Sequence, residues 1–148
     1  MNVKKKLLAV LALGMTLLFT ACGNQAAAGG ATGTGSSVTV DYGTSALYSQ
    51  QDMDAAIALI QKEFATWEGC EMHSIKYAGD DCNSADNISW MNELSDGANY
   101  TQCIEFLTDF HSPKEGGGAW EPDSEYTAYE WWLARPDGGD WVLETFGY

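Results

Sequence analysis

The stretch that decides the fold is residues 49–69, SQQDMDAAIALIQKEFATWEG. Ser49 and Asp52 have the spacing of a capping box, and an acidic residue in the first turn is favoured by the helix dipole. Apolar residues then recur with a spacing close to 3.6, at Met53, Ile57, Ile60, Phe64 and Trp67. Gly69 is expected to end the element. The sequence therefore predicts an amphipathic helix that packs on another layer.

Four segments after this helix are rich in aromatic and β-branched residues, which is typical of strands. The expected strands are residues 70–78, 100–111, 125–135 and 141–148. The last two are joined by RPDGGD, whose proline and glycines favour a tight turn and an antiparallel pair. A second, shorter helix is predicted over residues 84–94, and a long glycine-containing loop over residues 112–124.

This order of elements predicts an α+β fold, in which one long amphipathic helix packs on a curved antiparallel sheet of about four strands. The architecture is of the cystatin-like or nuclear-transport-factor-2-like kind, with a short second helix. We expect the globular domain to span residues 46–148. The preceding residues 22–45 are rich in Gly, Ala, Ser and Thr and predict a flexible tether, although VTV at residues 38–40 also fits a short edge strand.

The N-terminus has the organisation of a secretory signal. Three lysines at residues 4–6 precede an apolar run over residues 7–19, which is shorter than the ~20 residues of a membrane-spanning helix. The following LFTAC at residues 18–22 resembles a bacterial lipobox, in which Cys22 receives a diacylglyceryl group. We therefore expect a signal peptide over residues 1–21 and a fatty-acyl anchor on the outer face of the cell membrane. The alternative is an ordinary signal peptide with a chance cysteine.

The chain is strongly acidic. It has 21 Asp and Glu against 7 Lys and Arg, a formal charge of −14. Removal of residues 1–21 would leave 4 basic residues and a charge of 4 − 21 = −17. Such a balance argues against nucleic acid as a partner, because phosphate binding needs clustered Lys and Arg. It also argues against a basic patch on anionic lipid, so the expected membrane contact is the lipid on Cys22.

The remaining cysteines and an acidic turn are candidates for cross-linking and metal binding. Cys82 and Cys103 are expected to meet when the second strand returns antiparallel to the first, so a disulfide between them is weighed against three free thiols. Oxygen ligands gather at Asp80, Asp81, Asn83 and Asp86. Their alternation fails for a calcium loop, and a polar turn that caps the second helix is the favoured interpretation. No cofactor is predicted.

The sequence offers one weak catalytic candidate. With a strand period of two, Glu105, Asp109 and His111 share one face, together with Cys103 and Leu107. A histidine beside carboxylates is a candidate general base or zinc ligand. No catalytic motif accompanies it, and a charged, half-exposed sheet face explains the same pattern.

Tryptophan is abundant, with six residues in the chain. Adjacent Trp131 and Trp132 point to opposite faces of a strand, so one ring is expected in the core and the other on the surface. The candidate binding surface is aromatic and consists of Trp120, Tyr129, Trp131, Trp132 and Trp141. The competing interpretation is that these rings only fill the concavity of a small curved sheet.

Several strings resemble a known group of proteins. These are YSQQDMDAA at 48–56, FATWEGCE at 64–71, IKYAGD at 75–80, FLTDFHSP at 106–113 and WWLAR at 131–135. They are similar to an uncharacterised family of small lipoproteins of Clostridia-type Firmicutes, and to an extracytoplasmic domain appended to receptors of the β-lactam-sensing zinc peptidase type. The resemblance covers residues 48–148 and implies a surface module. It supplies no functional residues, and the peptidase helix of those receptors is absent from this chain.

The sequence thus predicts a non-enzymatic, lipid-anchored, extracytoplasmic binding or sensory module of the bacterial cell envelope, with an unknown envelope ligand or protein partner. One alternative is an accessory or regulatory lipoprotein that acts on a membrane protein. The other is a small hydrolase-like enzyme that uses His111 with Asp109 or Glu105.

Overall fold

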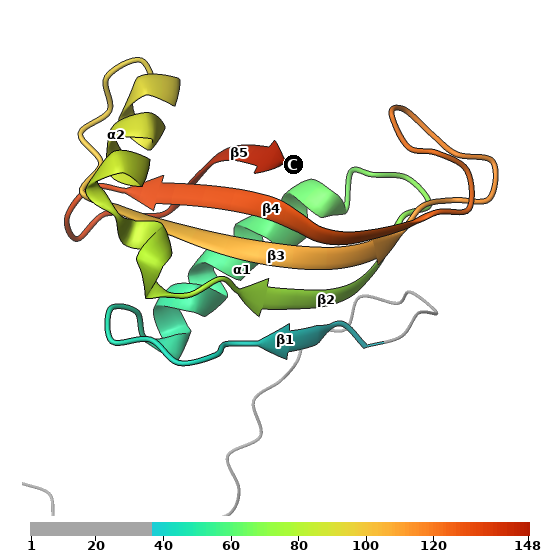
Figure 1. The fold of residues 1–148 in the computed structure, drawn as a ribbon, viewed down its shortest axis with the longest axis horizontal. Helices are drawn as coiled ribbons and strands as arrows, with labels where there is room; N and C mark the ends of the chain where they lie inside the picture. Colours follow the sequence, from blue (N-terminus) through green and yellow to red (C-terminus); the bar gives the residue numbers. More distant parts are fainter. Residues whose placement is uncertain (1–36) are drawn as a thin grey trace, which may run out of the picture. The chain divides into compact units, whose positions relative to one another are not determined.

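The computed structural model describes residues 37–148. The predicted signal peptide, Cys22 and the tether up to residue 36 lie outside the described residues. The elements, in chain order, are β1 (Thr39–Asp41), α1 (Gln50–Phe64), β2 (Glu71–Tyr77), the 3₁₀ helix η1 (Asp80–Asn83), α2 (Ala85–Leu94), β3 (Gln102–His111), β4 (Glu125–Arg135) and β5 (Val142–Gly147). Figure 1 shows an α+β arrangement in which α1 crosses one face of a five-stranded sheet.

The sheet is open and mixed, with the strand order β1-β2-β3-β4-β5. β2 to β5 are antiparallel neighbours and lie within the four predicted segments. The prediction of a purely antiparallel sheet was wrong, because β1 adds a fifth strand parallel to β2, with Val40 opposite Ile75. Residues 39–45, which we assigned to the tether, are therefore part of the folded domain. The short edge strand that residues 38–40 also fitted is thus present as β1, although three residues carry too little pattern to decide it from the sequence.

The helix α1 begins as the sequence predicts. Ser49 is the N-cap: its hydroxyl accepts from the Asp52 amide at 3.2 Å, and the Asp52 carboxylate accepts from the Ser49 amide at 3.0 Å. The helix ends at Phe64 and not at Gly69, and turns connect it to β2. Gly69, with φ of +77°, lies in this connection, where a side chain would be strained.

The core lies between α1 and the sheet. Alternate residues of β3 face the helix, and Phe110 meets Phe64 of α1 edge to face at 5.5 Å. The largest fully buried side chains of this layer are Trp131, Phe106, Phe110, Ile60, Ile75, Ile104 and Leu133. The other alternate set of β3, which contains Glu105, Leu107 and Asp109, points to the face that α1 leaves uncovered.

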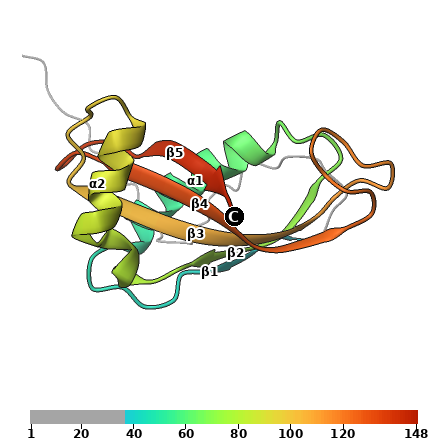
Figure 2. The ribbon, with the colours of Figure 1, turned by 45° about the horizontal axis from the view of Figure 1, so that its top comes forward.

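The second helix, α2, lies across one end of the sheet, where β3 begins and β4 ends (Figure 2). Its start matches the prediction, since the Ser84 hydroxyl accepts from the Asn87 amide at 3.2 Å. Met91 is fully buried beneath it. Within residues 37–148, no helix has the length and apolar character needed to cross a membrane.

Candidate functional site

Aromatic side chains gather where α1 ends, between the end of β3, the start of β4 and the end of β5. We call this cluster the aromatic end; it consists of Phe64, Trp67, Phe110, Trp120, Tyr126, Tyr129, Trp131, Phe146 and Tyr148. Trp67 is central: its ring stacks on Trp131 at 5.1 Å and lies 4.9 Å from Trp120. Edge-to-face and offset contacts of this kind fix the rings relative to one another.

Burial falls from the inside of the aromatic end to its outside. Trp131 and Phe110 are fully buried, whereas Trp67 and Trp120 are partly exposed. Phe146 keeps 38% of its surface exposed and Tyr148 keeps 76%. The cluster is therefore anchored in the core and opens to solvent on one side, as expected for an interaction surface rather than for core packing alone.

A cavity of about 380 Å³ opens beside the two exposed tryptophans. Its lining comes from the end of α1 and from the long loop between β3 and β4, and consists of Thr66, Trp67, Glu68, Gly116, Gly117, Gly118 and Trp120. The volume suits a small ligand or one side chain of a larger partner. Apolar walls, one carboxylate and glycine backbone groups give it the means to bind.

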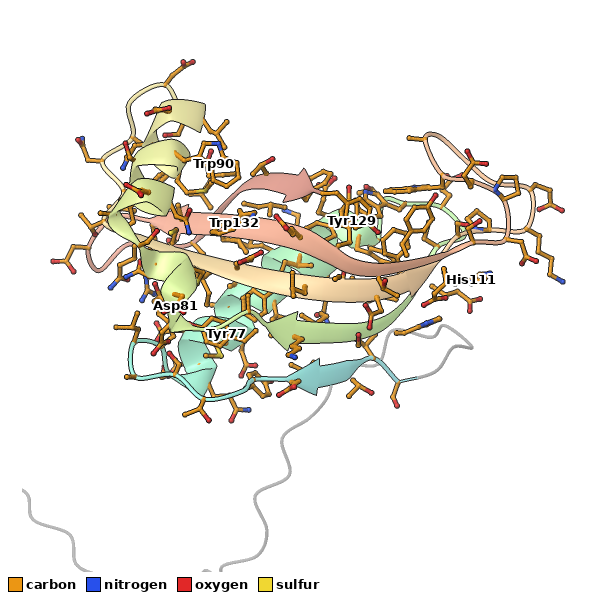
Figure 3. The ribbon with its side chains drawn as sticks, in the orientation of Figure 1. Tyr77, Asp81, Trp90, His111, Tyr129 and Trp132 are labelled. Carbon is orange, nitrogen blue, oxygen red and sulfur yellow. The ribbon has the colours of Figure 1, made fainter. Side chains whose placement is uncertain are left out.

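The five aromatic residues of the predicted binding surface differ in burial and in position. Only Trp120 reaches the cavity. Tyr129, Trp131, Trp132 and Trp141 are all buried, which agrees with the competing interpretation that these rings fill the concavity of the sheet. Trp131 and Trp132 do point to opposite faces, but Trp90 of α2 covers Trp132 edge to face at 5.4 Å (Figure 3). The outward ring is therefore buried too.

Sequence reasoning missed other members of the site. Trp67 was assigned to the apolar stripe of the helix, but it lies beyond the last helical residue, Phe64, and turns towards Trp120. Phe146 lies within the predicted last strand, and nothing in the sequence around it indicated that it joins an aromatic cluster. The run of three glycines, Gly116 to Gly118, was visible in the sequence as a loop, and its position against Trp67 depends on the tertiary structure.

A second cluster, which is polar, contains the two histidines and lies at the base of the loop between β3 and β4. Glu125 accepts from Nδ1 of His73 and from Nδ1 of His111, both at 3.0 Å, and Nε2 of His111 lies 3.2 Å from Asp123 (Figure 3). Both ring nitrogens of His111 thus face carboxylates, an arrangement that favours the imidazolium form. Hydrogen bonds to Asp123 and Glu125 raise the pKa of His111. No group of three metal-ligating side chains converges within residues 37–148.

The structure does not bring the proposed catalytic residues together. Asp109 accepts from the Ser74 hydroxyl and from the Ala128 amide, both at 2.9 Å, whereas the hydrogen-bond partners of His111 among residues 37–148 are Asp123 and Glu125. Glu105 lies opposite Trp132, further along β3. Burial, and secondarily the charge of Glu130, raise its pKa to about 7. The face that these residues share was predicted correctly, but a catalytic pair is not formed.

Side chains of the acidic turn, residues 80–86, make hydrogen bonds that stabilise the fold. Asp80 accepts from the Tyr77 hydroxyl at 2.7 Å and from the Ala46 amide at 2.8 Å, and hydrogen bonds from Ser45, Ala46 and Tyr77 hold its pKa below the usual range. Asn83 accepts from the Cys103 amide at 2.8 Å. Asp81 and Asp86 are exposed. The interpretation of this segment as a polar turn before a capped helix is confirmed.

Cys82 and Cys103 are buried neighbours, and both are free thiols, as is Cys70. The Cys103 thiol donates to the Cys82 carbonyl at 3.0 Å. Burial raises the pKa of both thiols, to about 12 for Cys103. In this form neither is a reactive thiolate.

Comparison of the chain with protein-family models gives no match, and comparisons with curated proteins and with solved structures give none either. The resemblance to small lipoproteins therefore stays a prediction.

Proposed function

We propose that this protein is a lipid-anchored, extracytoplasmic binding or sensory module of the bacterial cell envelope, and that the aromatic end is its contact surface. The observation that carries the proposal is the cavity of about 380 Å³ between Trp67, Trp120 and the glycine loop. Its walls are partly exposed indoles held from behind by buried rings such as Trp131. A rigid, open aromatic surface loses little conformational entropy on binding.

The anchor is proposed to be the lipid on Cys22, which lies outside the described residues. The finer description of the fold as cystatin-like or nuclear-transport-factor-2-like is also a proposal. Its support is one long helix packed on a sheet whose β2 to β5 are antiparallel. Membership of the Clostridia-type lipoprotein family rests on the five sequence strings alone.

A second candidate function is an accessory lipoprotein that acts on a membrane protein. The observation in its favour is the sheet edge β5, which is flanked by exposed large apolar side chains. These are Trp90, Leu94, Val142 and Phe146, with exposed fractions between 38% and 47%. An edge strand offers unpaired backbone groups to a partner strand.

We also propose that Cys82 and Cys103 become linked in an oxidising compartment: the two thiols give up two electrons and two protons as their S–S bond forms, and a disulfide-bearing oxidant takes these up as its own S–S bond breaks to give a dithiol. The proposed disulfide is supported by the packing of the two residues, because the thiol of each lies against the carbonyl oxygen of the other. Such a link would join η1 to the start of β3.

A thermal-shift screen tests the main proposal. All core side chains lie between residues 48 and 141, so a chain that begins at residue 23 is expected to fold without its anchor. The panel contains cell-wall fragments, sugars, peptides, β-lactams, Ca²⁺ and Zn²⁺. A ligand at 100 times its Kd should stabilise the fold by ~2.7 kcal/mol, a shift of several degrees for a domain of this size.

The matched variants are Trp120→Leu and Trp90→Leu. Both rings are partly exposed, but Trp120 lines the cavity, whereas Trp90 packs on Trp132 on the other face of the sheet. The proposal predicts that Trp120→Leu abolishes the ligand-induced shift and that Trp90→Leu preserves it. A shift that survives Trp120→Leu places the ligand elsewhere. Silence across the panel contradicts a small ligand and favours the accessory role. Loss of fatty-acid labelling in Cys22→Ser, expressed with its signal, tests the anchor.

A further inference from the structure

We propose that the cavity at the aromatic end takes an organic cation, an ammonium or guanidinium group carried on an apolar stem. This inference rests on the proposed binding function and names the class of ligand for the same site.

The first argument is a glycine that the fold does not require. Gly116 and Gly118 have φ of +69° and +59°, and a Cβ on Gly116 would lie 3.0 Å from the Trp120 carbonyl oxygen. Gly117 lies between them without a positive φ, and a Cβ there would meet only Pro113 Cγ at 3.8 Å, an ordinary contact. A side chain is thus sterically allowed at Gly117. Three consecutive glycines thus line the cavity with backbone instead of side chains, which leaves room for an occupant.

The second argument is charge. Glu68 is the one charged residue that lines the cavity, and neither Lys nor Arg does. Residues 37–148 carry 21 acidic side chains against Lys62, Lys76, Lys114 and Arg135. An anion would meet no compensating charge in the lining and would be repelled at long range. A cation gains from the overall field and from the Glu68 carboxylate.

The third argument is that this protein already packs a cation on an indole. At the opposite end of α1, the guanidinium carbon of Arg135 lies 4.2 Å from the ring centroid of Trp141. The π-face of tryptophan attracts cations, and an exposed contact of this kind tightens binding by roughly two- to fivefold. Trp67 and Trp120 offer indoles with no cation of the chain over them within the described residues.

The test compares a cation with its uncharged twin. Choline and 3,3-dimethyl-1-butanol have nearly the same shape and differ in the charge of the quaternary centre. We would titrate both into the chain from residue 23, together with acetyl-arginine amide and N-acetylglucosamine, and follow tryptophan fluorescence at low and high salt. We expect choline and acetyl-arginine amide to bind several-fold more tightly than the neutral compounds, and less tightly as salt increases.

Four variants locate the binding. Gly117→Val should weaken binding of choline, because it adds a branched side chain to the loop that lines the cavity, with Gly117→Ala as the milder variant should the valine variant fail to fold. Glu68→Gln should weaken the two cations several-fold and reduce the salt dependence, while leaving the melting temperature unchanged. Glu93→Gln, which removes an exposed carboxylate from α2 without touching the cavity, is the matched control and should change nothing.

Equal affinity for choline and its neutral twin would overturn the inference, as would binding of N-acetylglucosamine alone or the absence of choline binding. These results leave the proposed function standing if an envelope fragment still gives a Trp120-dependent thermal shift. Failure of both experiments would remove the site altogether.

Discussion

The two ends of α1 are held by different kinds of contact: hydrogen bonds at the first turn, and aromatic packing at the last. At its first turn, the Asp52 carboxylate accepts from the Ser49 amide and, at 2.8 Å, from Nη1 of Arg135 on β4. The Trp141 indole donates to the Asp52 carbonyl at 3.0 Å, and the Tyr48 hydroxyl donates to the Cys103 carbonyl at 2.8 Å. Polar groups at this end are paired with one another.

At the last turn of α1 the contacts are mostly between rings. Trp131, in the buried layer, donates its indole N–H to the Thr108 hydroxyl at 2.9 Å. The indole N–H groups of Trp67 and Trp120 have no hydrogen-bond partner among residues 37–148, although their rings are packed on several neighbours. The first end of the helix is therefore closed by its own chain, whereas the last end leaves aromatic surface and two indole N–H groups without a partner among residues 37–148.

The largest expected effect separates the buried and open halves of the aromatic end. Trp131→Ala should destabilise the fold by about 3–5 kcal/mol, because it leaves a cavity beneath Trp67. Trp120→Ala should cost much less, since that ring is partly exposed, and should still remove ligand binding. Urea unfolding of both variants measures this difference. Equal losses would mean that Trp120 is a core residue and not part of a binding surface.

The next effect concerns the end of the domain where α1 begins, which we call the paired end because its polar groups bond to one another. Cys103 belongs to it, since its carbonyl accepts from the Tyr48 hydroxyl. If Cys82 and Cys103 form a disulfide, the chain-entropy model gives a stabilisation of about 3 kcal/mol for a loop of this length. We expect the oxidised protein to lose that stability on reduction, and intact-mass measurement to show two hydrogens gained. Cys82→Ala should make stability independent of the reductant. A chain that stays fully alkylatable after export would contradict the link.

A smaller effect tests the ion pair at the first turn. Hydrogen bonds from Ser49 and then Arg135 lower the pKa of Asp52 to about 2 from 3.8. Because the folded pKa lies below the unfolded one, the stabilisation is present above pH 3.8 and is lost as the pH falls towards 2. Asp52→Ala should cost about 2 kcal/mol at pH 7 and much less near pH 2. The double variant with Arg135→Met, measured in a thermodynamic cycle, isolates the pair; additive losses would show that it contributes nothing.

The smallest effect is at His111, at the base of the loop that contains Gly116 to Gly118. Its pH dependence is opposite to that of Asp52, because its pKa is raised and not lowered. The pKa of His111 is raised, so its contribution is present below the unfolded pKa, near 6.5, and is lost as the pH rises through the folded value. We expect titration by NMR to give His111 a pKa above that of an unfolded histidine. Glu125→Gln should lower it. A normal pKa for His111 would show that the contacts with Asp123 and Glu125 do not persist in solution.

Much of the frame was predictable because it depends on local chemistry. The Ser49 cap, the apolar period of α1 and the turn after Arg135 each depend on neighbouring residues, and the predicted segments contain β2 to β5. β1 was undecidable, since its three residues are specified by pairing with β2, far along the chain.

The site was less predictable, because it depends on which rings the tertiary structure covers. Composition placed Trp120 and Trp132 together as candidates, yet α2 buries the second and leaves the first open. Period-two reasoning placed Asp109 and His111 on one face correctly. It gave no access to Asp123 and Glu125, the actual partners of His111, which come from the loop and from β4.

The most direct test of the central claim is a residue-resolved map of ligand contact. Amide chemical shifts of the chain from residue 23 would be recorded before and after addition of whichever compound stabilises it. We predict perturbations at residues 66–68 and 116–120, with those at residues 48–52, 135 and 141 unchanged. Perturbations centred on the paired end or on the uncovered sheet face around Glu105, with residues 116–120 silent, would contradict the assignment of binding to the aromatic end.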